Sequence, residues 1–538
     1  MFPFIAPFSL LSTLQLASSF DYETACSLSS LSTTHFSNKT TLFDASLVPA
    51  GSTLQFPDTD ASCAATPQLV VADICRITML VETSNSSSIH MEAWLPRNWT
   101  GRFLSLGNSG LGGCIGYEGI GYENLAYTSS LGFAAVSANN GHNGTSGAAF
   151  ENSPQVLADF AYRSVHTGTV IGKELTKAFY GQRHTKSYYA GCSTGGRQGL
   201  KSVEDFPEDF DGVLAGAPGV DFNALIAWVG HLYSEITGDS SSPSFIPTDI
   251  WSGLIHKEVI SQCDGIDGAI DGIIEDPHLC VFDPSPLLCS GNTTAANGTC
   301  LTTTQIETVH KVYAPFLGLD RREIYLAPLP GGETNPYLLQ ALSGEPSIFA
   351  AQWFRYAVYN SSFDPKMLTM EDYEYAIRLN PFDIATFKGD VRAFRDRGGK
   401  VLVYHGQADG LTTPRIVERY HERVQQVSGG SPEDLDEYFR LFRISGMEHC
   451  FGGPGAWEIG ATGGSAPSLD ADKNVLVAMV KWVEMGEAPE TIEGVKYFAD
   501  NREKGEALRR KHCRYPFRNT YNGVGEPSKL GSWRCEIA

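Results

Sequence analysis

Five consecutive residues, 191–195, carry the pattern Gly-x-Ser-x-Gly, with Ser193 at its centre. An apolar segment precedes them, and residues 195–203 can form a helix. A sharp strand-to-helix turn holds a serine hydroxyl clear of the sheet, and glycines on either side avoid the collisions that a Cβ atom would cause. Thr194 would begin the helix, so its backbone N–H would face the charge that develops on an attacked carbonyl oxygen. The pattern predicts Ser193 as a nucleophile, although a glycine-rich turn can match these five residues by chance.

A serine hydroxyl is a weak nucleophile until a neighbouring base takes its proton, and that base needs a carboxylate to orient it. In this arrangement the chain order is Ser, then Asp or Glu, then His. Asp409 and His449 each follow an apolar segment typical of a strand, in that order. We predict that they complete a catalytic triad with Ser193. His405, at the end of a strand, and His166, inside a helix, are better explained as packed structural histidines.

The cysteines next to these residues sharpen the prediction. Cys192 immediately precedes Ser193, and Cys450 immediately follows His449. A disulfide between them would hold their Cα atoms about 4.4–6.8 Å apart, and the nucleophile would then meet its base. The chain has twelve cysteines and no tight Cys-x-x-Cys pair, which indicates a disulfide framework and not a zinc site.

The elements that must position these residues alternate between strand and helix patterns. We expect strands at 101–108, 132–137, 187–190, 212–215, 401–404 and 438–444, and helices at 153–180, 195–203, 415–426 and 475–485. Between 221 and 386 the alternation breaks down into a long stretch rich in Pro, Gly, Ser and aromatic residues. This order predicts an α/β-hydrolase fold with a mostly parallel sheet and a large inserted lid domain. The catalytic domain would comprise residues 20–220 and 387–538, and the lid domain residues 221–386.

Composition and the first residues indicate where the protein works. A net charge of −21 over 538 residues argues against nucleic acid or an anionic membrane as a partner. Residues 1–19 form an apolar run that ends in small residues and is too interrupted to span a membrane, so we interpret them as a secretory signal. We expect a secreted, extracellular protein. Sequons for N-glycosylation occur at Asn38, Asn85, Asn98, Asn143, Asn292, Asn297 and Asn360.

Residues 263–276 are dense in carboxylates separated by glycines. Ca²⁺ takes six to eight oxygen ligands, and a loop with repeated Asp and Gly residues can fold so that carboxylates and carbonyls surround one ion. The spacing is not that of an EF-hand. A solvated acidic turn is the alternative, but it would leave several like charges crowded together. We therefore predict a structural calcium site in the lid.

Three motifs together resemble the fungal tannase and feruloyl esterase family: residues 191–199, 406–409 and 446–450. The resemblance implies the triad Ser193–Asp409–His449 and a lid domain that shapes the acyl pocket. It also implies six disulfides, which would pair Cys26–Cys75, Cys63–Cys114, Cys192–Cys450, Cys263–Cys280, Cys289–Cys300 and Cys513–Cys535. For the calcium loop it implies ligation by the side chains of Asp264, Asp267 and Asp271 and by the carbonyls of Ala269 and Ile273.

The activity that this resemblance implies is that of a serine carboxylic ester hydrolase, most like a type B feruloyl esterase. Such an enzyme releases phenolic acids, such as ferulic acid, from plant polysaccharide esters or small esters through an acyl-enzyme and needs no organic cofactor. Backbone N–H groups of Thr194 and, in the 107–113 turn, Gly110 would hold the oxyanion. Trp353, Phe354 and Tyr356 could stack on a phenolic ring, or simply form the core of the lid.

Other functions remain open from the sequence. A tannase that acts on gallate esters would share the same catalytic motifs. A serine carboxypeptidase or lipase would use the same triad, and a hydrolase-fold binding protein would have lost catalysis. The intact Ser, Asp and His in the correct order speak against this last alternative.

Overall fold

The computed structural model describes residues 20–117, 119–290 and 298–537. The predicted leader and two sequons, Asn292 and Asn297, lie outside these residues. Within the described part of the chain, no helix is long and apolar enough to cross a membrane.

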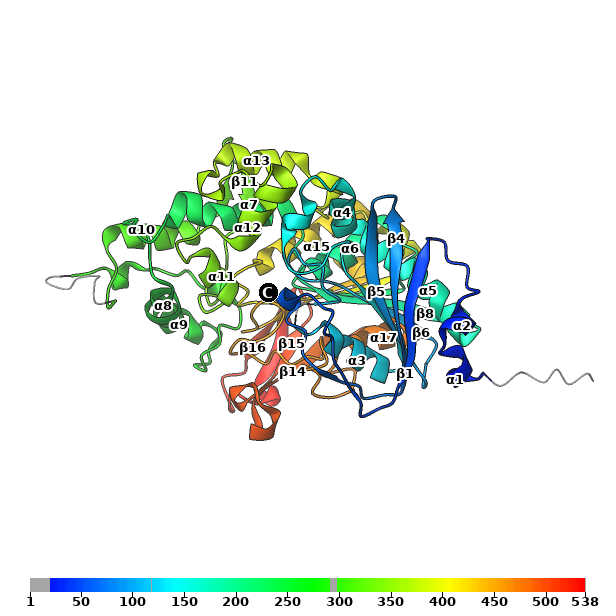
Figure 1. The fold of residues 1–538 in the computed structure, drawn as a ribbon. Coiled ribbons are helices and arrows are strands. Elements are labelled where there is room, and N and C mark those ends of the chain that lie inside the picture. Colours follow the sequence, from blue (N-terminus) through cyan, green and yellow to red (C-terminus); the bar gives the residue numbers. More distant parts are fainter. Residues whose placement is uncertain (1–19, 118, 291–297, 538) are drawn as a thin grey trace, which may run out of the picture.

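A nine-stranded sheet forms the centre of the molecule (Figure 1). Its strands, in spatial order, are β1 (Thr40–Val48), β4 (Ile74–Ser84), β5 (Ser87–Pro96), β7 (Phe133–Ala138), β6 (Arg102–Leu106), β8 (Lys186–Cys192), β9 (Gly212–Gly216), β12 (Lys400–Gly406) and β13 (Phe439–Ile444). The pairs from β7 to β13 are all parallel, whereas β1, β4, β5 and β7 pair antiparallel. The predicted mostly parallel sheet is confirmed, with an antiparallel extension that the sequence had not indicated.

The central strands are continuous apolar runs because helices cover both faces of the sheet. On β8, Tyr188 packs into the cluster that contains α3 (Gly121–Ser130) and α17 (Val475–Met485), and the next residue, Tyr189, packs into the opposite cluster. The second face is covered by α5 (Ser164–Tyr180) and α6 (Thr194–Asp205). Successive side chains of a strand point to opposite faces, so one short apolar run serves both cores.

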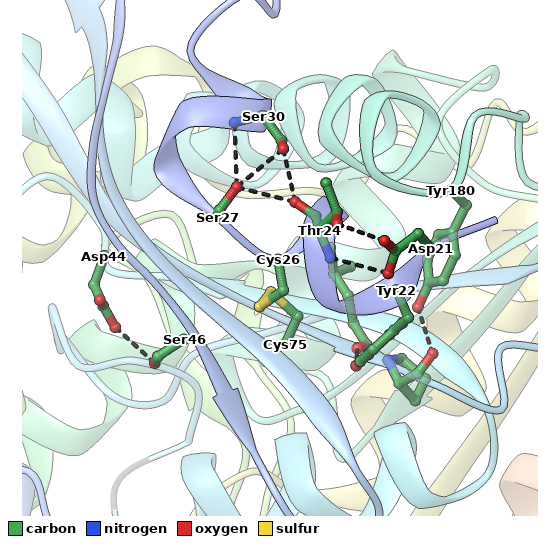
Figure 2. The surroundings of a disulfide bond; sticks show 12 residues. Asp21, Tyr22, Thr24, Cys26, Ser27, Ser30, Asp44, Ser46, Cys75 and Tyr180 are labelled. Atoms are coloured by element: carbon green, nitrogen blue, oxygen red, sulfur yellow. Dashed lines mark hydrogen bonds between the residues drawn. A yellow bond between two sulfur atoms is a disulfide. The ribbon is translucent and has the colours of Figure 1, made fainter.

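Two connections anchor the chain ends to this sheet. Figure 2 shows the Cys26–Cys75 disulfide, which joins the end of α1 (Tyr22–Ala25) to β4. Beside it the hydroxyl of Tyr22 donates a hydrogen bond of 2.6 Å to the carbonyl oxygen of Leu95. At the other end of the chain, β14 (Thr491–Tyr497) pairs with β15 (Glu506–Cys513) in a separate two-stranded sheet, and an antiparallel bridge between Arg514 and Phe442 of β13 attaches this region to the central sheet.

The segment of residues 221–386, here called the inserted segment, leaves the sheet after β9 and returns at β12. Its helices are α7 (Phe222–His231), α8 (Thr248–Ile250), α9 (His256–Cys263), α10 (Thr303–Val312), α11 (Pro336–Ala341), α12 (Ile348–Trp353) and α13 (Met370–Leu379). They gather in green and yellow-green on the left and top of Figure 1, on the side away from β1. Trp228, Trp251, Trp353 and Tyr373 are fully buried in the core of the segment.

A partly buried ionic contact ties the inserted segment to the catalytic half. His278 lies between Asp276 of the segment, at 3.0 Å, and Glu418 of α15 (Pro414–Ser428), at 2.9 Å. Burial alone would lower the pKa of His278, but the hydrogen bonds to the two carboxylates outweigh it and raise that pKa to about 9. The charged imidazolium therefore bridges the two parts of the chain.

This contact predicts a pH-dependent stability. Because the folded-state pKa of His278 is raised from 6.5 to about 9, its contribution is complete below pH 6.5 and is lost as the pH rises through 9. The contribution is at most about 3 to 4 kcal/mol, at about 1.4 kcal/mol per pKa unit. We expect the Tm advantage of the wild type over His278→Gln to be largest near pH 6 and to shrink towards pH 10, as thermal scans of both proteins would measure. Parallel Tm curves across this range would contradict the assignment.

Candidate active site

Ser193 lies in the strained turn that its motif predicts. The residue follows β8, begins α6 and has a φ of 63°, a conformation that non-glycine residues rarely adopt. Its N–H donates to the carbonyl oxygen of Gly216 at 3.0 Å. A Cβ atom on Gly191 would lie 2.8 Å from the carbonyl carbon of Gly195, and one on Gly195 would lie 2.8 Å from the carbonyl oxygen of Asn108. Both glycines of the motif are therefore required by the local packing.

His449 and Asp409 form a short buried pair. The Nδ1 atom of His449 lies 2.6 Å from Oδ2 of Asp409, and both side chains are inaccessible to solvent. Burial alone would raise the pKa of Asp409, but His449 and hydrogen bonds from two imidazoles hold that pKa well below its usual value. The carboxylate is therefore ionised at any pH at which an esterase works.

A disulfide brings the proposed base to the proposed nucleophile. Cys192 and Cys450 are bonded, with their Cα atoms 6.0 Å apart, so Ser193 and His449 lie one residue from either end of the same bridge. The Nε2 atom of His449 is buried and has no hydrogen-bond partner among the described residues. It is the nitrogen that the bond to Asp409 leaves available for a proton from the serine.

The other five predicted disulfides are confirmed as well. They are Cys26–Cys75, Cys63–Cys114, Cys263–Cys280, Cys289–Cys300 and Cys513–Cys535. No cysteine of the described residues is free.

The predicted oxyanion residues lie against each other. The hydroxyl of Thr194 donates to the carbonyl oxygen of Gly110 at 2.7 Å, and Gly110 has a φ of 50° that suits glycine. The amide of Thr194 is in the first turn of α6, where N–H groups have no partner within the helix. The two residues predicted to bind the oxyanion are thus in contact, and their role as donors stays a prediction.

Gln198 holds this loop in place, a role that the sequence did not indicate. Its side-chain oxygen accepts the N–H of Asn108 at 3.0 Å, and its amide nitrogen lies 3.1 Å from the side-chain oxygens of both Asn108 and Asn140. The residue belongs to the first turns of α6, so the nucleophile helix also fixes the loop that carries Gly110.

Two aromatic rings of the inserted segment border the site. Tyr337 of α11 meets the His449 ring edge-on, with 5.6 Å between ring centroids. Phe349 of α12 lies beside Gly110, since a Cβ atom there would be 3.3 Å from its ring. The two rings are 6.2 Å apart and each is partly exposed, so they form a continuous aromatic wall over the base and the oxyanion loop.

The aromatic residues singled out from the sequence do not form this wall. Trp353 and Phe354 have no exposed surface and belong to the hydrophobic core, and Tyr356 is partly buried against the same core. Their alternative interpretation, as core of the inserted segment, is therefore the one that the structure supports. His166 bonds Asp209 at 2.9 Å, as a structural histidine would, and His405 is buried in β12, as predicted for a packed histidine.

The acidic loop is folded around Asp264. The carboxylate of Asp264 accepts backbone N–H groups from Asp271, Gly272 and Ile273 at 3.0–3.2 Å. Asp271 in turn pairs with the buried Arg510 at 2.8 Å. These contacts already compensate much of the negative charge of Asp264 and Asp271, two of the three predicted carboxylate ligands.

Asp267 is the exception in this loop. Its Oδ2 atom is buried without a partner among the described residues, and burial first, then Glu275 and Asp271, raise its pKa to about 7. Ala269 and Ile273, the predicted carbonyl ligands, are both buried, and the N–H of Ala269 donates to Oδ1 of Asp267 at 2.8 Å. Over the described ranges, no three His, Cys, Asp or Glu side chains are grouped so that they could hold a metal ion. The loop thus presents one unsatisfied oxygen and not a complete carboxylate cage.

The sequons within the described residues differ in exposure. Asn85, Asn98, Asn143 and Asn360 are exposed. Asn38 is half-buried, and its side-chain nitrogen donates to the carbonyl oxygen of Glu82 at 2.9 Å.

Comparison with known proteins identifies the family of the chain. The sequence pattern of a family described as "Tannase and feruloyl esterase" matches residues 75–388 and 360–536. The chain belongs to the tannase and feruloyl esterase family. Within this family, a probable feruloyl esterase B-1 of Aspergillus terreus is 48% identical over 493 residues, covering 91% of each chain. A probable feruloyl esterase B-1 of Aspergillus flavus is 46% identical over 539 residues, covering 99% of each chain.

Solved structures support the same conclusion. The crystal structure of feruloyl esterase B from Aspergillus oryzae has a TM-score of 0.90 at 42% identity, covering 96% of this chain and 100% of that one. A tannin acyl hydrolase from Aspergillus niger has a TM-score of 0.73 at 20% identity, covering 97% of each chain, and shows a common fold. The predicted family and α/β-hydrolase fold are therefore confirmed.

The geometry predicts a specific effect of the Cys192–Cys450 bridge. We expect Cys192→Ser/Cys450→Ser to lower kcat at temperatures far below its Tm, because the bridge fixes the turn of Ser193 directly to the turn of His449. Its Tm should also fall, since a loop this long can contribute about 5 kcal/mol in the chain-entropy model. Ester hydrolysis and thermal scans would measure both effects.

The matched control is Cys289→Ser/Cys300→Ser, which removes a bridge of the inserted segment with a sequence separation of 11. It should lower Tm and leave kcat unchanged at low temperature. A folded Cys192→Ser/Cys450→Ser protein with wild-type kcat would show that the bridge does not position the site.

Proposed function

We propose that the protein is a serine esterase of the feruloyl type, which hydrolyses esters of hydroxycinnamic acids. The observation that carries this proposal is the buried 2.6 Å pair of His449 and Asp409, held beside the strained Ser193 turn by a disulfide. Membership of the family and the relatives named feruloyl esterase B, at 46–48% identity, support the same reaction.

The reaction follows from the positions of these groups. His449 Nε2 takes the proton of Ser193 Oγ as that oxygen attacks the ester carbonyl, and Asp409 keeps the imidazole in the correct tautomer. The backbone N–H groups of Thr194 and Gly110 bind the oxyanion of the tetrahedral intermediate. The proton then passes from His449 to the leaving alcohol, the ester C–O bond breaks, and water hydrolyses the acyl-enzyme in a second, similar step.

The acyl group that we propose is a phenolic acid. Tyr337 and Phe349 offer an aromatic wall to a ring attached to Ser193, and aromatic pairs prefer edge-to-face or offset contacts over this range of distances. The inserted segment would act as a lid that supplies this wall. The physiological substrate would be a phenolic ester on plant polysaccharide or a small ester.

A tannase activity on gallate esters is the second candidate, because the family includes both activities in its description. Sequence identity favours a feruloyl esterase over a tannase, because the matched tannin acyl hydrolase is only 20% identical to this chain. A carboxypeptidase, a lipase or a binding protein without catalysis has no comparable support.

We also propose that the protein is secreted and N-glycosylated. The apolar residues 1–19 support a leader, and the disulfide framework suits an oxidising compartment. The exposed sequons at Asn85, Asn98, Asn143 and Asn360 are accessible to glycosylation.

A structural Ca²⁺ in the acidic loop is a further part of the proposal. The oxygens of Asp264, Asp267, Ala269, Asp271 and Ile273 would hold it. The unpartnered buried oxygen of Asp267 supports a cation there, because burying a carboxylate without compensation is costly. A bound ion would neutralise the crowded carboxylates and brace the loop that Cys263 and Cys280 close.

The nucleophile is tested by Ser193→Ala. We expect kcat/KM for methyl ferulate to fall by about 10³-fold or more, because only binding and the oxyanion donors would remain. Ser202→Ala, further along α6, serves as the control and should keep its activity. Retention of activity by Ser193→Ala would contradict the assignment.

Comparing kcat/KM for methyl ferulate, caffeate, p-coumarate, sinapate and gallate would decide between a feruloyl esterase and a tannase. A preference for gallate would favour the tannase.

The calcium proposal is tested by metal analysis and stability. We expect about one Ca²⁺ per chain and a lower Tm after chelation, since saturation at a hundred times Kd contributes about 2.7 kcal/mol. Asp267→Asn should lose the metal and the response to chelator. Asp249→Asn, outside the loop, should keep both. Absence of bound Ca²⁺ together with a chelator-insensitive Tm would refute the site.

A further inference from the structure

A second histidine contacts the carboxylate of the proposed triad. His405, on β12, has no exposed surface, and its Nε2 lies 3.0 Å from Oδ2 of Asp409 and 2.8 Å from the carbonyl oxygen of Thr412. A backbone carbonyl can only accept a hydrogen bond, so Nε2 of His405 must carry the proton. The same N–H therefore points at Asp409 and at the loop that follows it.

Asp409 is surrounded by donors on both of its oxygens. Oδ1 accepts the backbone N–H groups of Leu411 and Thr412, each at 2.9 Å. Oδ2 accepts from His405 at 3.0 Å and from His449 at 2.6 Å. Rotation of the carboxylate would break bonds on both oxygens, so its plane is held at the angle that presents Oδ2 to His449.

The location of His405 excludes a role as a second base. Both acceptors of its Nε2 are internal, and its Nδ1 is buried without a partner among the described residues. A proton on Nδ1 would be an unsatisfied buried donor, which favours the neutral Nε2–H tautomer. The ring can hold Asp409, but it cannot reach an ester.

We propose that His405 is a positioning residue of the esterase reaction, whose Nε2–H fixes the carboxylate of Asp409 so that this carboxylate can orient the base His449. This inference rests on the proposed triad. It assigns a role in turnover to a histidine that simple core packing would otherwise explain. Outer partners that orient an active-site group can be worth about 10–100-fold in activity, as they are around metal ligands.

Three variants separate positioning from packing. His405→Met removes the donor and roughly keeps the volume, whereas His405→Gln places an amide N–H where Nε2 was. His421→Met is the matched control, because His421 is also a buried imidazole next to the sheet, on α15, and has no contact with Asp409 in the structure. We would measure kcat and KM for methyl ferulate well below the lowest Tm, together with Tm itself.

If His405 positions the acid, His405→Met lowers kcat by about 10–100-fold with KM nearly unchanged. His405→Gln recovers most of that loss, and His421→Met lowers only Tm. Wild-type kcat in His405→Met, or equal losses in the Met and Gln variants, would overturn the inference. Ser193→Ala and Asp409→Asn are assayed in parallel. If these two stay active, the proposed function itself fails, whereas if only His405→Met stays active, the inference alone fails.

A measurement on the unmodified protein guards against a variant that does not fold. Selective ¹⁵N labelling of histidine reports which ring nitrogen carries the proton, and His405→Gln identifies the signal of residue 405. The inference requires protonated Nε2 and unprotonated Nδ1. A proton on Nδ1 with a bare Nε2 would exclude the bond to Asp409 and overturn it.

Discussion

The bond between His449 and Asp409 is the interaction on which the site depends. Its length of 2.6 Å and its burial restrict the orientation of the imidazole and leave Nε2 as the nitrogen that is not bound to Asp409. The carboxylate can serve in this way only because four donors stabilise its charge inside the protein. A buried ionised group without such partners would take up a proton or destabilise the fold. The hydrogen bonds that compensate the buried charge of the carboxylate are thus the same ones that set the geometry of the site.

The sheet and the inserted segment contribute different parts of this design. The parallel strands β8, β12 and β13 end on the same side, so the turns that follow them bring serine, acid and base together. The inserted segment adds Tyr337 and Phe349, which come from two short helices and contact the base and the oxyanion loop. The sheet therefore positions the proposed catalytic residues, and the inserted segment supplies the aromatic wall that an acyl group would meet.

Sequence patterns were sufficient to locate the residues of the proposed triad and the central strands. Ser193 is marked by glycines whose Cβ atoms would collide, and the parallel strands are marked by short apolar runs that are buried on both faces. The antiparallel strands β4 and β5 were not predicted, although buried residues alternate with partly buried ones along most of β4. A separate inspection of residues 74–96 for period-two alternation could have found them.

Roles set by long-range packing could not be predicted in the same way. Trp353 and Phe349 lie four residues apart on one short helical stretch, yet one is core and the other faces the site. His405 and Gln198 likewise act through partners that only the folded chain brings near.

The bridge between Cys192 and Cys450 also orders events during synthesis. Its halves are separated by 258 residues, so a ribosome must complete β9, the whole inserted segment and β13 before the second thiol exists. Until that thiol is oxidised, no disulfide joins the turn of the serine to the turn that carries its base. The nascent chain therefore lacks a complete catalytic centre through most of its translation. Formation of the bridge then requires an oxidising environment.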